Sequence, residues 1–190
     1  MTSLRTVTAS LLLLLVAASL SYAEEAATDS RFAPFAGKWH LVEVEGEHEE
    51  RIGEVDRAVG DLNWVMRSIA RPMLRKAVTP PDAYEFALID ERLHFAAQGN
   101  PLRPLRFDGS ETESEGPRGT VKHRARNHGE QIETLWQTSE GEGGSRFRVI
   151  DDGQTLLVES TLQITAISGV EAIVTQTRFR RTPSVASAPN

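Results

Sequence analysis

The sequence has 190 residues with 21 basic and 27 acidic side chains, a net charge of −6 and no cysteine. One domain of this length buries a proper hydrophobic core, whereas the acidic balance argues against nucleic acid as a partner. The lack of cysteine excludes disulfides, thiolate metal sites and thiol nucleophiles.

The N-terminal segment has the pattern of a secretory signal peptide. Arg5 supplies a positive start, an apolar run follows at 7–20, and Ser21 and Ala23 are small residues at the two positions that define a cleavage site. Cleavage after residue 23 would remove Arg5 and change the net charge from −6 to −7. We therefore expect an exported protein, periplasmic or secreted, with a flexible leader at 24–34.

The fold is expected to begin at Phe35. Residues 38–45 alternate between apolar and polar side chains as a half-buried strand does, and Trp39 lies on the apolar face. The acidic residues 45–50 that follow are interpreted as a solvated loop.

The next segment changes from strand to helical periodicity. Apolar residues recur at steps of three and four and predict a helical insertion at about 54–77 with one apolar stripe, formed by Ile52, Val55, Val59, Leu62, Met66, Ile69 and Met73. Pro72 is expected to kink this helix or to begin a second short one.

Short β-strands fill the rest of the chain. Eight are predicted, at 84–89, 92–97, 102–107, 120–126, 131–138, 146–150, 155–167 and 170–180. Turn-forming residues separate them, including the glycine-rich stretch 141–144. Nine strands with one helical insertion after the first predict a mostly β protein, an antiparallel up-and-down β-barrel over 35–181, with a disordered tail at 182–190.

The opening Gly37-Lys38-Trp39 within residues 35–44 carries a family resemblance. With the helical insertion and the meander, the chain resembles the fatty-acid-binding proteins, the wider lipocalin superfamily, and exported bacterial lipocalin-like proteins of unassigned function. The resemblance implies a barrel that holds a small apolar or amphipathic molecule, such as a fatty acid. It also implies structural roles for Gly37 and Trp39, with the indole closing one end of the barrel under an arginine from the last strand.

In the resembling proteins, an Arg-x-Tyr pair on the last strand binds a ligand carboxylate. Arg178 matches that arginine, and Arg180 stands where the tyrosine would be. The two side chains lie two residues apart and share a face. If that face turns inward, a ligand anion would compensate the buried charge; otherwise an outer salt bridge with Glu133 or Glu159, or a stack on Trp39, is expected.

Two further residues are candidates for ligand binding. His123 is expected to look inward, and Trp136 would offer a flat apolar wall if it lines the cavity. Lys122, Arg124 and Arg126 share the strand face opposite to His123.

The sequence offers no clear catalytic or metal-binding motif. It lacks a Gly-x-Ser-x-Gly elbow, a His-Glu-x-x-His motif and a phosphate-binding glycine loop, so no cofactor or metal is predicted. Two alternatives to ligand binding stay open. One is an isomerase or hydrolase of the same shape that uses His94, His123 and a carboxylate; the other is an envelope interaction protein whose barrel its own side chains fill.

The insertion is expected to act as a lid. Its apolar stripe would cover the mouth of the barrel, leaving Arg67, Arg71 and Arg75 on the opposite face. This basic row is either a solvated helix face or a surface for transient contact with anionic lipids.

Overall fold

A computed structural model describes residues 31–116 and 119–182. The signal peptide expected at 1–23 and almost all of the tail expected at 182–190 lie outside these residues. The elements are β1 (Gly37–Val42), α2 (Glu47–Ala58), α3 (Trp64–Ala77), β2 (Ala83–Ile89), β3 (Arg92–Ala97), β4 (Arg103–Pro104), β5 (Thr112–Gly116), β6 (Gly119–Asn127), β7 (Gln131–Gln137), β8 (Gly141–Ile150), a 3-10 turn (Asp151–Gly153), β9 (Thr155–Ile164) and β10 (Ile173–Arg181).

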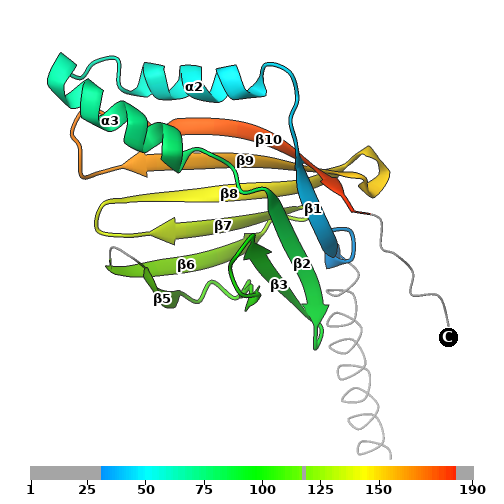
Figure 1. The fold of residues 1–190 in the computed structure, drawn as a ribbon. Helices are drawn as coiled ribbons and strands as arrows, with labels where there is room; N and C mark the ends of the chain where they lie inside the picture. The colour runs from blue at the N-terminus through cyan, green and yellow to red at the C-terminus, as the bar shows by residue number, and fades with distance from the viewer. Residues whose placement is uncertain (1–30, 117–118, 183–190) are drawn as a thin grey trace, which may run out of the picture.

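The strands form one curled antiparallel sheet in the order β4-β3-β2-β1-β10-β9-β8-β7-β6-β5. Figure 1 shows β1–β3 crossing in front of β6–β9, with the helices above the strands. The chain is therefore a mostly β, lipocalin-like half-barrel with its helices after the first strand, which confirms the expected fold. In the described residues neither helix is long and apolar enough to cross a membrane.

The sheet does not close into a full ring of hydrogen bonds. Within the described residues, β4 and β5 each pair with one strand only and form the two edges. The strand expected at 102–107 shrinks to Arg103–Pro104, although Leu105 N still donates to Leu93 O at 2.8 Å. Pro104 has no N–H to offer to a further strand on its outer side. This short strand leaves an opening between β4 and β5.

The glycines of β8 correct a second expectation. Residues 141–144 do not form a turn but begin a ten-residue strand, and the reversal lies just upstream, where Thr138 N donates to Gly141 O at 2.8 Å. A Cβ on Gly143 would lie 2.7 Å from the Trp136 ring, and one on Gly144 would lie 2.8 Å from Leu135 Cδ2. The glycines thus make room for two large neighbours within the sheet.

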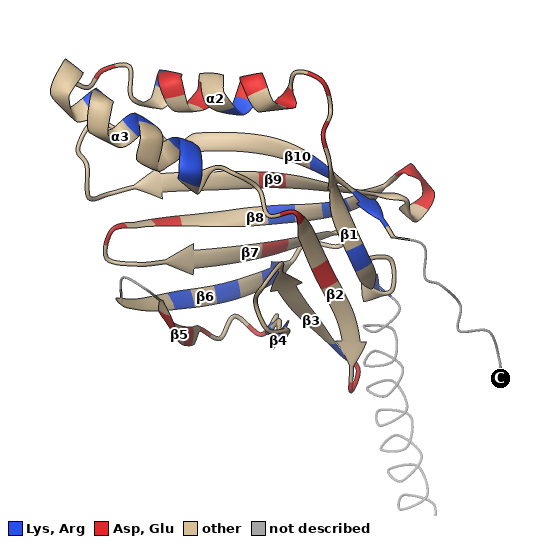
Figure 2. Cartoon of the chain, in the orientation of Figure 1, with Lys and Arg blue, Asp and Glu red and all other residues tan. Residues whose placement is uncertain are grey.

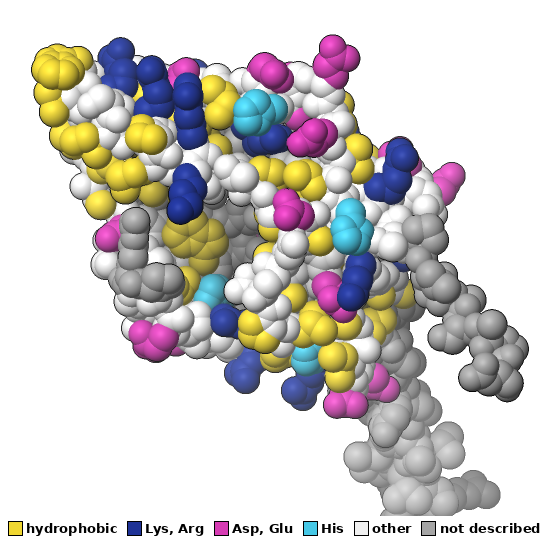
Figure 3. Space-filling view, in the orientation of Figure 1, with side chains coloured by type: hydrophobic (Ala, Val, Ile, Leu, Met, Phe, Trp, Pro, Cys, Tyr) yellow, Lys and Arg dark blue, Asp and Glu magenta, His cyan; other side chains and the backbone are white. Residues whose placement is uncertain are grey.

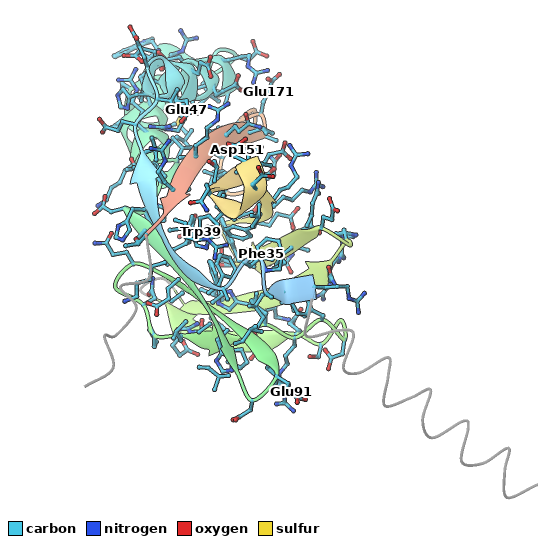
Figure 4. All side chains as sticks on the ribbon, turned by 90° about the vertical axis from the view of Figure 1, so that its right-hand side faces the viewer. Phe35, Trp39, Glu47, Glu91, Asp151 and Glu171 are labelled. Carbon is cyan, nitrogen blue, oxygen red and sulfur yellow. The ribbon has the colours of Figure 1, made fainter. Side chains whose placement is uncertain are left out.

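Trp39 lies at the centre of the main core. Its indole is fully buried, its Nε1 donates to Phe35 O at 2.8 Å, and the guanidinium of Arg181 stacks 4.4 Å from the ring centroid. Figure 4 shows Trp39 and Phe35 together inside the curve of the sheet. The predicted arginine stack is confirmed, and Arg181 supplies it.

The described core begins upstream of Phe35. Phe32 is buried and stacks on Phe107 with ring centroids 4.8 Å apart. Gly37 begins β1 with φ at +136°, a conformation that side-chain-bearing residues rarely adopt.

The helical insertion is longer than expected and breaks elsewhere. Residues 47–50, interpreted above as loop, form the first turn of α2. The break lies between Ala58 and Trp64, where the Asn63 side chain accepts from Met66 N at 3.0 Å and caps α3. Pro72 lies inside α3 without ending it.

This break splits the predicted apolar stripe. Val55, Val59 and Leu62 are buried, as the stripe predicts, and the structure packs them against the β9–β10 hairpin. Beyond the break α3 buries Ala70 and Leu74 instead. The turn changes the rotation of the second helix, so that one stripe does not continue through both.

Candidate functional site

A cavity lies under the opening between the sheet edges. It has a volume of about 450 Å³, and its apolar wall comes from Tyr84, Phe95, Leu105, Val121 and Trp136. Figure 3 shows a hollow on this side of the molecule, with hydrophobic and histidine side chains at its margin.

A second cavity continues from the first toward the end of α3. It has a volume of about 180 Å³, and Tyr84, Trp136 and Ser145 line both. Pro80 and Pro81, which follow α3, line its upper side. The interior therefore runs from the open side of the sheet to the helical end.

Trp136 and His123 both line the larger cavity. They are directly opposed on β7 and β6, and Trp136 in turn opposes Gly143 on β8, so all three share the inner face. The structure thus brings together two of the four residues predicted to bind ligand, and their binding stays a prediction.

His123 is held in a half-buried polar contact. Its Nε2 lies 2.9 Å from Ser114 Oγ on β5. Burial lowers the pKa of His123 below its ordinary value, and the positive charge of Arg103 lowers it further. The imidazole is therefore mainly neutral at pH 7.

The other two predicted ligand residues, Arg178 and Arg180, lie on the outer face. Inward positions on β10 belong to the alternate residues Thr175, Thr177 and Phe179. Arg178 pairs with Glu47 at the start of α2, where the Glu47 side chain is buried. Of the two alternatives, the inward placement is wrong, because strand alternation gives the inner face to the neighbouring residues. The outer salt bridge forms with Glu47 and not with Glu133 or Glu159.

Basic and acidic side chains also pair across the outer face of the sheet. Lys122 and Arg124 contact Glu111 at 3.0 and 2.7 Å. Arg146 bridges Glu133 and Glu159 at 3.0 and 3.3 Å. Figure 2 shows these charges on β6–β9, and their mutual compensation makes this face a poor candidate for a ligand site.

A row of hydroxyl groups crosses the inner face, which the sequence analysis missed. Thr134, Ser145, Ser160 and Thr175 are opposed in one cross-strand register from β7 to β10. Ser145 Oγ lies 3.0 Å from Ser160 Oγ. The alternation of side chains along β8 and β9 would have placed Ser145 and Ser160 on the inner face. The interpretation of 141–144 as a turn kept Ser145 out of the strand.

The hydroxyl of Tyr84 joins this polar row. Burial raises the pKa of Tyr84 to about 12, and a hydrogen bond with Ser145 acts in the opposite direction. The cavity therefore combines an aromatic wall with a few convergent hydroxyl groups, an arrangement typical of small-molecule sites.

The residues of the enzyme hypothesis do not come together. His94 alternates with Leu93 and Phe95, which pack into the core, so it lies on the face of β3 opposite to the cavity. Within 31–116 and 119–182, no three His, Asp or Glu side chains are placed to hold a metal ion.

Neither a protein-family model nor a curated protein sequence matches the chain significantly. Solved structures with a similar fold include fatty-acid-binding protein 1 of Echinococcus granulosus, with a TM-score of 0.45, 12% identity, and coverage of 79% of this chain and 98% of that one. The Schistosoma mansoni fatty-acid-binding protein in complex with arachidonic acid has a TM-score of 0.45, 16% identity and coverage of 80% and 98%. Zebrafish ileal bile-acid-binding protein with cholic acid has a TM-score of 0.42, 15% identity and coverage of 78% and 99%.

Proposed function

We propose that this protein binds a small apolar or amphipathic molecule in the interior of the half-barrel. The observation that carries the proposal is the 450 Å³ cavity between the two halves of the sheet, with Tyr84, Phe95 and Trp136 in its wall. Its volume lies within the range of about 300–1,000 Å³ that is usual for ligand pockets.

Titration with the neutral fluorescent probe N-phenyl-1-naphthylamine tests this proposal. We expect saturable binding that weakens about tenfold or more in Trp136→Ala, because the probe loses an aromatic contact. Trp64→Ala is the matched control, since the Trp64 side chain is 80% exposed on α3. Absence of saturable binding in the wild type would favour a barrel filled by its own side chains.

We further propose that α3 contacts lipid surfaces, through its apolar face rather than its basic row. Arg71 and Arg75 pair with Asp56 of α2 at 3.0 and 3.1 Å, and Arg67 donates to backbone oxygens of the turn between the helices. The outer face of α3 instead exposes Trp64, Val65, Met66, Ile69 and Met73, visible as the hydrophobic area at the upper left of Figure 3.

Charge and composition favour an anionic membrane as the partner of this face. The helix carries four basic residues and no acidic one, and exposed Trp with flanking Arg and Lys is typical of interfacial helices. Co-sedimentation with anionic vesicles is expected for the wild type and not for the triple variant Trp64→Ser, Ile69→Ser, Met73→Ser. Concentration-dependent dimerisation without vesicle binding would assign the face to a second copy.

We also propose that the protein works outside the cytoplasm, on the strength of the sequence pattern at 1–23. The mass of the protein isolated from its own host should correspond to a chain beginning at Glu24. A mature chain that retains Met1 would contradict export.

A further inference from the structure

A basic rim borders the opening of the larger cavity. Arg103 on the edge strand β4 and His123 on β6 both line it, and the charge of Arg103 acts on His123. Ser114 holds the imidazole from the adjoining strand β5 through the 2.9 Å contact to Nε2. Three strands from the two edges of the sheet therefore converge at this point.

Arg103 combines two features that the other arginines around this cavity do not share, namely the lack of an ion pair and a charge that acts on His123. Arg124 is paired with Glu111 at 2.7 Å, whereas the lowered pKa of Asp108 is due mainly to hydrogen bonds with Ser110, and the charge of Arg106 adds only a small part. Arg103 has no ion pair with any described residue. Glu115, the acidic residue that lines the cavity, accepts a hydrogen bond from Thr120 Oγ1 at 3.3 Å.

The cavity margin thus has an excess of positive charge in a protein of net charge −6. Arg103, Arg106, Arg124 and Glu115 line it; Arg124 is paired with Glu111, and neither Arg103 nor Arg106 has an ion pair with a described residue. Behind them the wall is aromatic. A cation beside an apolar cavity matches a molecule with one anionic end and one apolar end.

We propose that Arg103 and His123 bind the anionic head group, a carboxylate or phosphate, of an amphiphile whose apolar part lies against Phe95, Tyr84 and Trp136. This inference rests on the proposed function and adds the orientation of the ligand within the cavity. The head group lies at the opening between β4 and β5, on the opposite face of the sheet from Arg178 and Arg180.

Head-group binding is coupled to a proton on His123. In the free protein, burial and Arg103 both hold the pKa of His123 below its ordinary value. A bound anion offsets the charge of Arg103 and stabilises the imidazolium, which raises the pKa of His123. Binding therefore takes up protons, and affinity falls as pH rises through the pKa of the complex. Arg106, Glu115 and Arg124 are the other charged residues that border the cavity.

Displacement of N-phenyl-1-naphthylamine by dodecanoate and by dodecanol tests the head-group site. We expect Arg103→Gln to weaken dodecanoate binding about tenfold, as for the loss of a charge-assisted hydrogen bond, and to leave dodecanol binding within about twofold. Arg180→Gln is the matched control, because it removes the same charge from the outer face. Equal dodecanoate affinity in Arg103→Gln and the wild type would overturn the site.

The proton coupling has its own measurement. Dodecanesulfonate stays ionised at every pH used, so its affinity should fall from pH 6 to 8 in the wild type and stay level in His123→Gln. The same slope in both proteins would overturn the role of His123. Inorganic phosphate serves as the tail-free anion, and if it bound as tightly as the sulfonate, the site would be one for free anions rather than amphiphiles.

These measurements distinguish a failure of the head-group site from a failure of the proposed ligand binding. If the wild type binds the neutral probe and dodecanol but Arg103→Gln changes nothing, the head-group site fails and the cavity stands. If the wild type binds no apolar probe at all, the proposed function itself fails.

Discussion

Gly143 leaves room for the ring of Trp136, which forms part of the cavity wall. An added Cβ would lie 2.5 Å from Thr161 O and 2.7 Å from the Trp136 ring. Gly143→Ala should therefore cost about 1–3 kcal/mol of unfolding free energy, as overpacking does, and weaken probe binding by displacing the indole. Chemical denaturation and probe titration measure the two effects.

Gly53→Ala is the control for this change. Gly53 lies within α2, and a Cβ there meets nothing within 4 Å. Alanine is the better helix former, so this variant should gain about 0.5–1 kcal/mol. Equal stabilities of the two variants would show that Gly143 is not a packing glycine.

Trp39 is the largest fully buried side chain among the described residues. Trp39→Ala removes a fully buried indole together with its hydrogen bond to Phe35 O and its stack with Arg181. The expected loss is about 3–5 kcal/mol, measured by urea denaturation. Trp64→Ala, on an exposed helix face, should stay within about 0.5 kcal/mol of the wild type; a loss below 1 kcal/mol for Trp39→Ala would contradict the structural role.

Tyr84 gives stability a dependence on alkaline pH. Burial raises its pKa to about 12 from the ordinary value of 10.0. Below pH 10 the phenol is neutral in both folded and unfolded chains. Between pH 10 and 12 the unfolded chain loses the proton and the folded chain keeps it, so unfolding becomes easier by about 2–3 kcal/mol.

Tyr84→Phe should remove that part of the alkaline loss. The comparison of denaturation midpoints at pH 8 and pH 11 measures it, and the difference between the two proteins isolates the contribution of Tyr84. A parallel decline in both proteins would mean that the phenol is ionised in the fold.

At the scale of elements, α2 and α3 are held by few polar contacts. Asp56 accepts from Arg75 at 3.1 and 3.2 Å and contacts Arg71 at 3.0 Å. Since these side chains are about 40% exposed, Asp56→Asn should cost only about 0.5–1 kcal/mol. In Asp56→Asn, hydrogen exchange should be faster in α3 and unchanged in β8 and β9. Glu49→Gln, which also lies on α2, should leave both the stability and the exchange of α3 unchanged.

The helical segment also marks where sequence periodicity stops being informative. The stripe from Ile52 to Leu62 predicted burial correctly, because it lies within one helix and the turn that ends it. The continuation of the stripe to Met73 predicted burial wrongly, because the break before Trp64 changes the rotation of the second helix about its axis. The spacing of apolar residues carries no information about that rotation. Only the packing of Ala70 and Leu74 against the first helix and the β9–β10 hairpin decides which face of α3 is buried.

At the scale of the whole molecule, turn spacing and alternation sufficed to predict a mostly β antiparallel fold with a helical insertion after the first strand. Strands such as β2, β3 and β6 lie close to their expected bounds, because their turns are set by local residues. Which side chains of a strand face the interior could be assigned only from the pairing of that strand with its neighbours in the structure. His123 was placed correctly by its apolar neighbours, whereas on β10 the polar side chains Thr175 and Thr177 took the inner positions and left the arginines outside.

The opening between β4 and β5 has a consequence for behaviour at high concentration. Free strand edges invite edge-to-edge association between molecules, yet Pro104 interrupts one edge and the exposed Glu113 and Glu115 repel along the other. The double variant Glu113→Thr, Glu115→Thr should therefore scatter light at concentrations where a charge-matched variant, Glu49→Thr with Glu171→Thr, stays clear. Like charges on the β5 edges of two molecules thus oppose their pairing, while the cavity beside this edge remains open to the solvent.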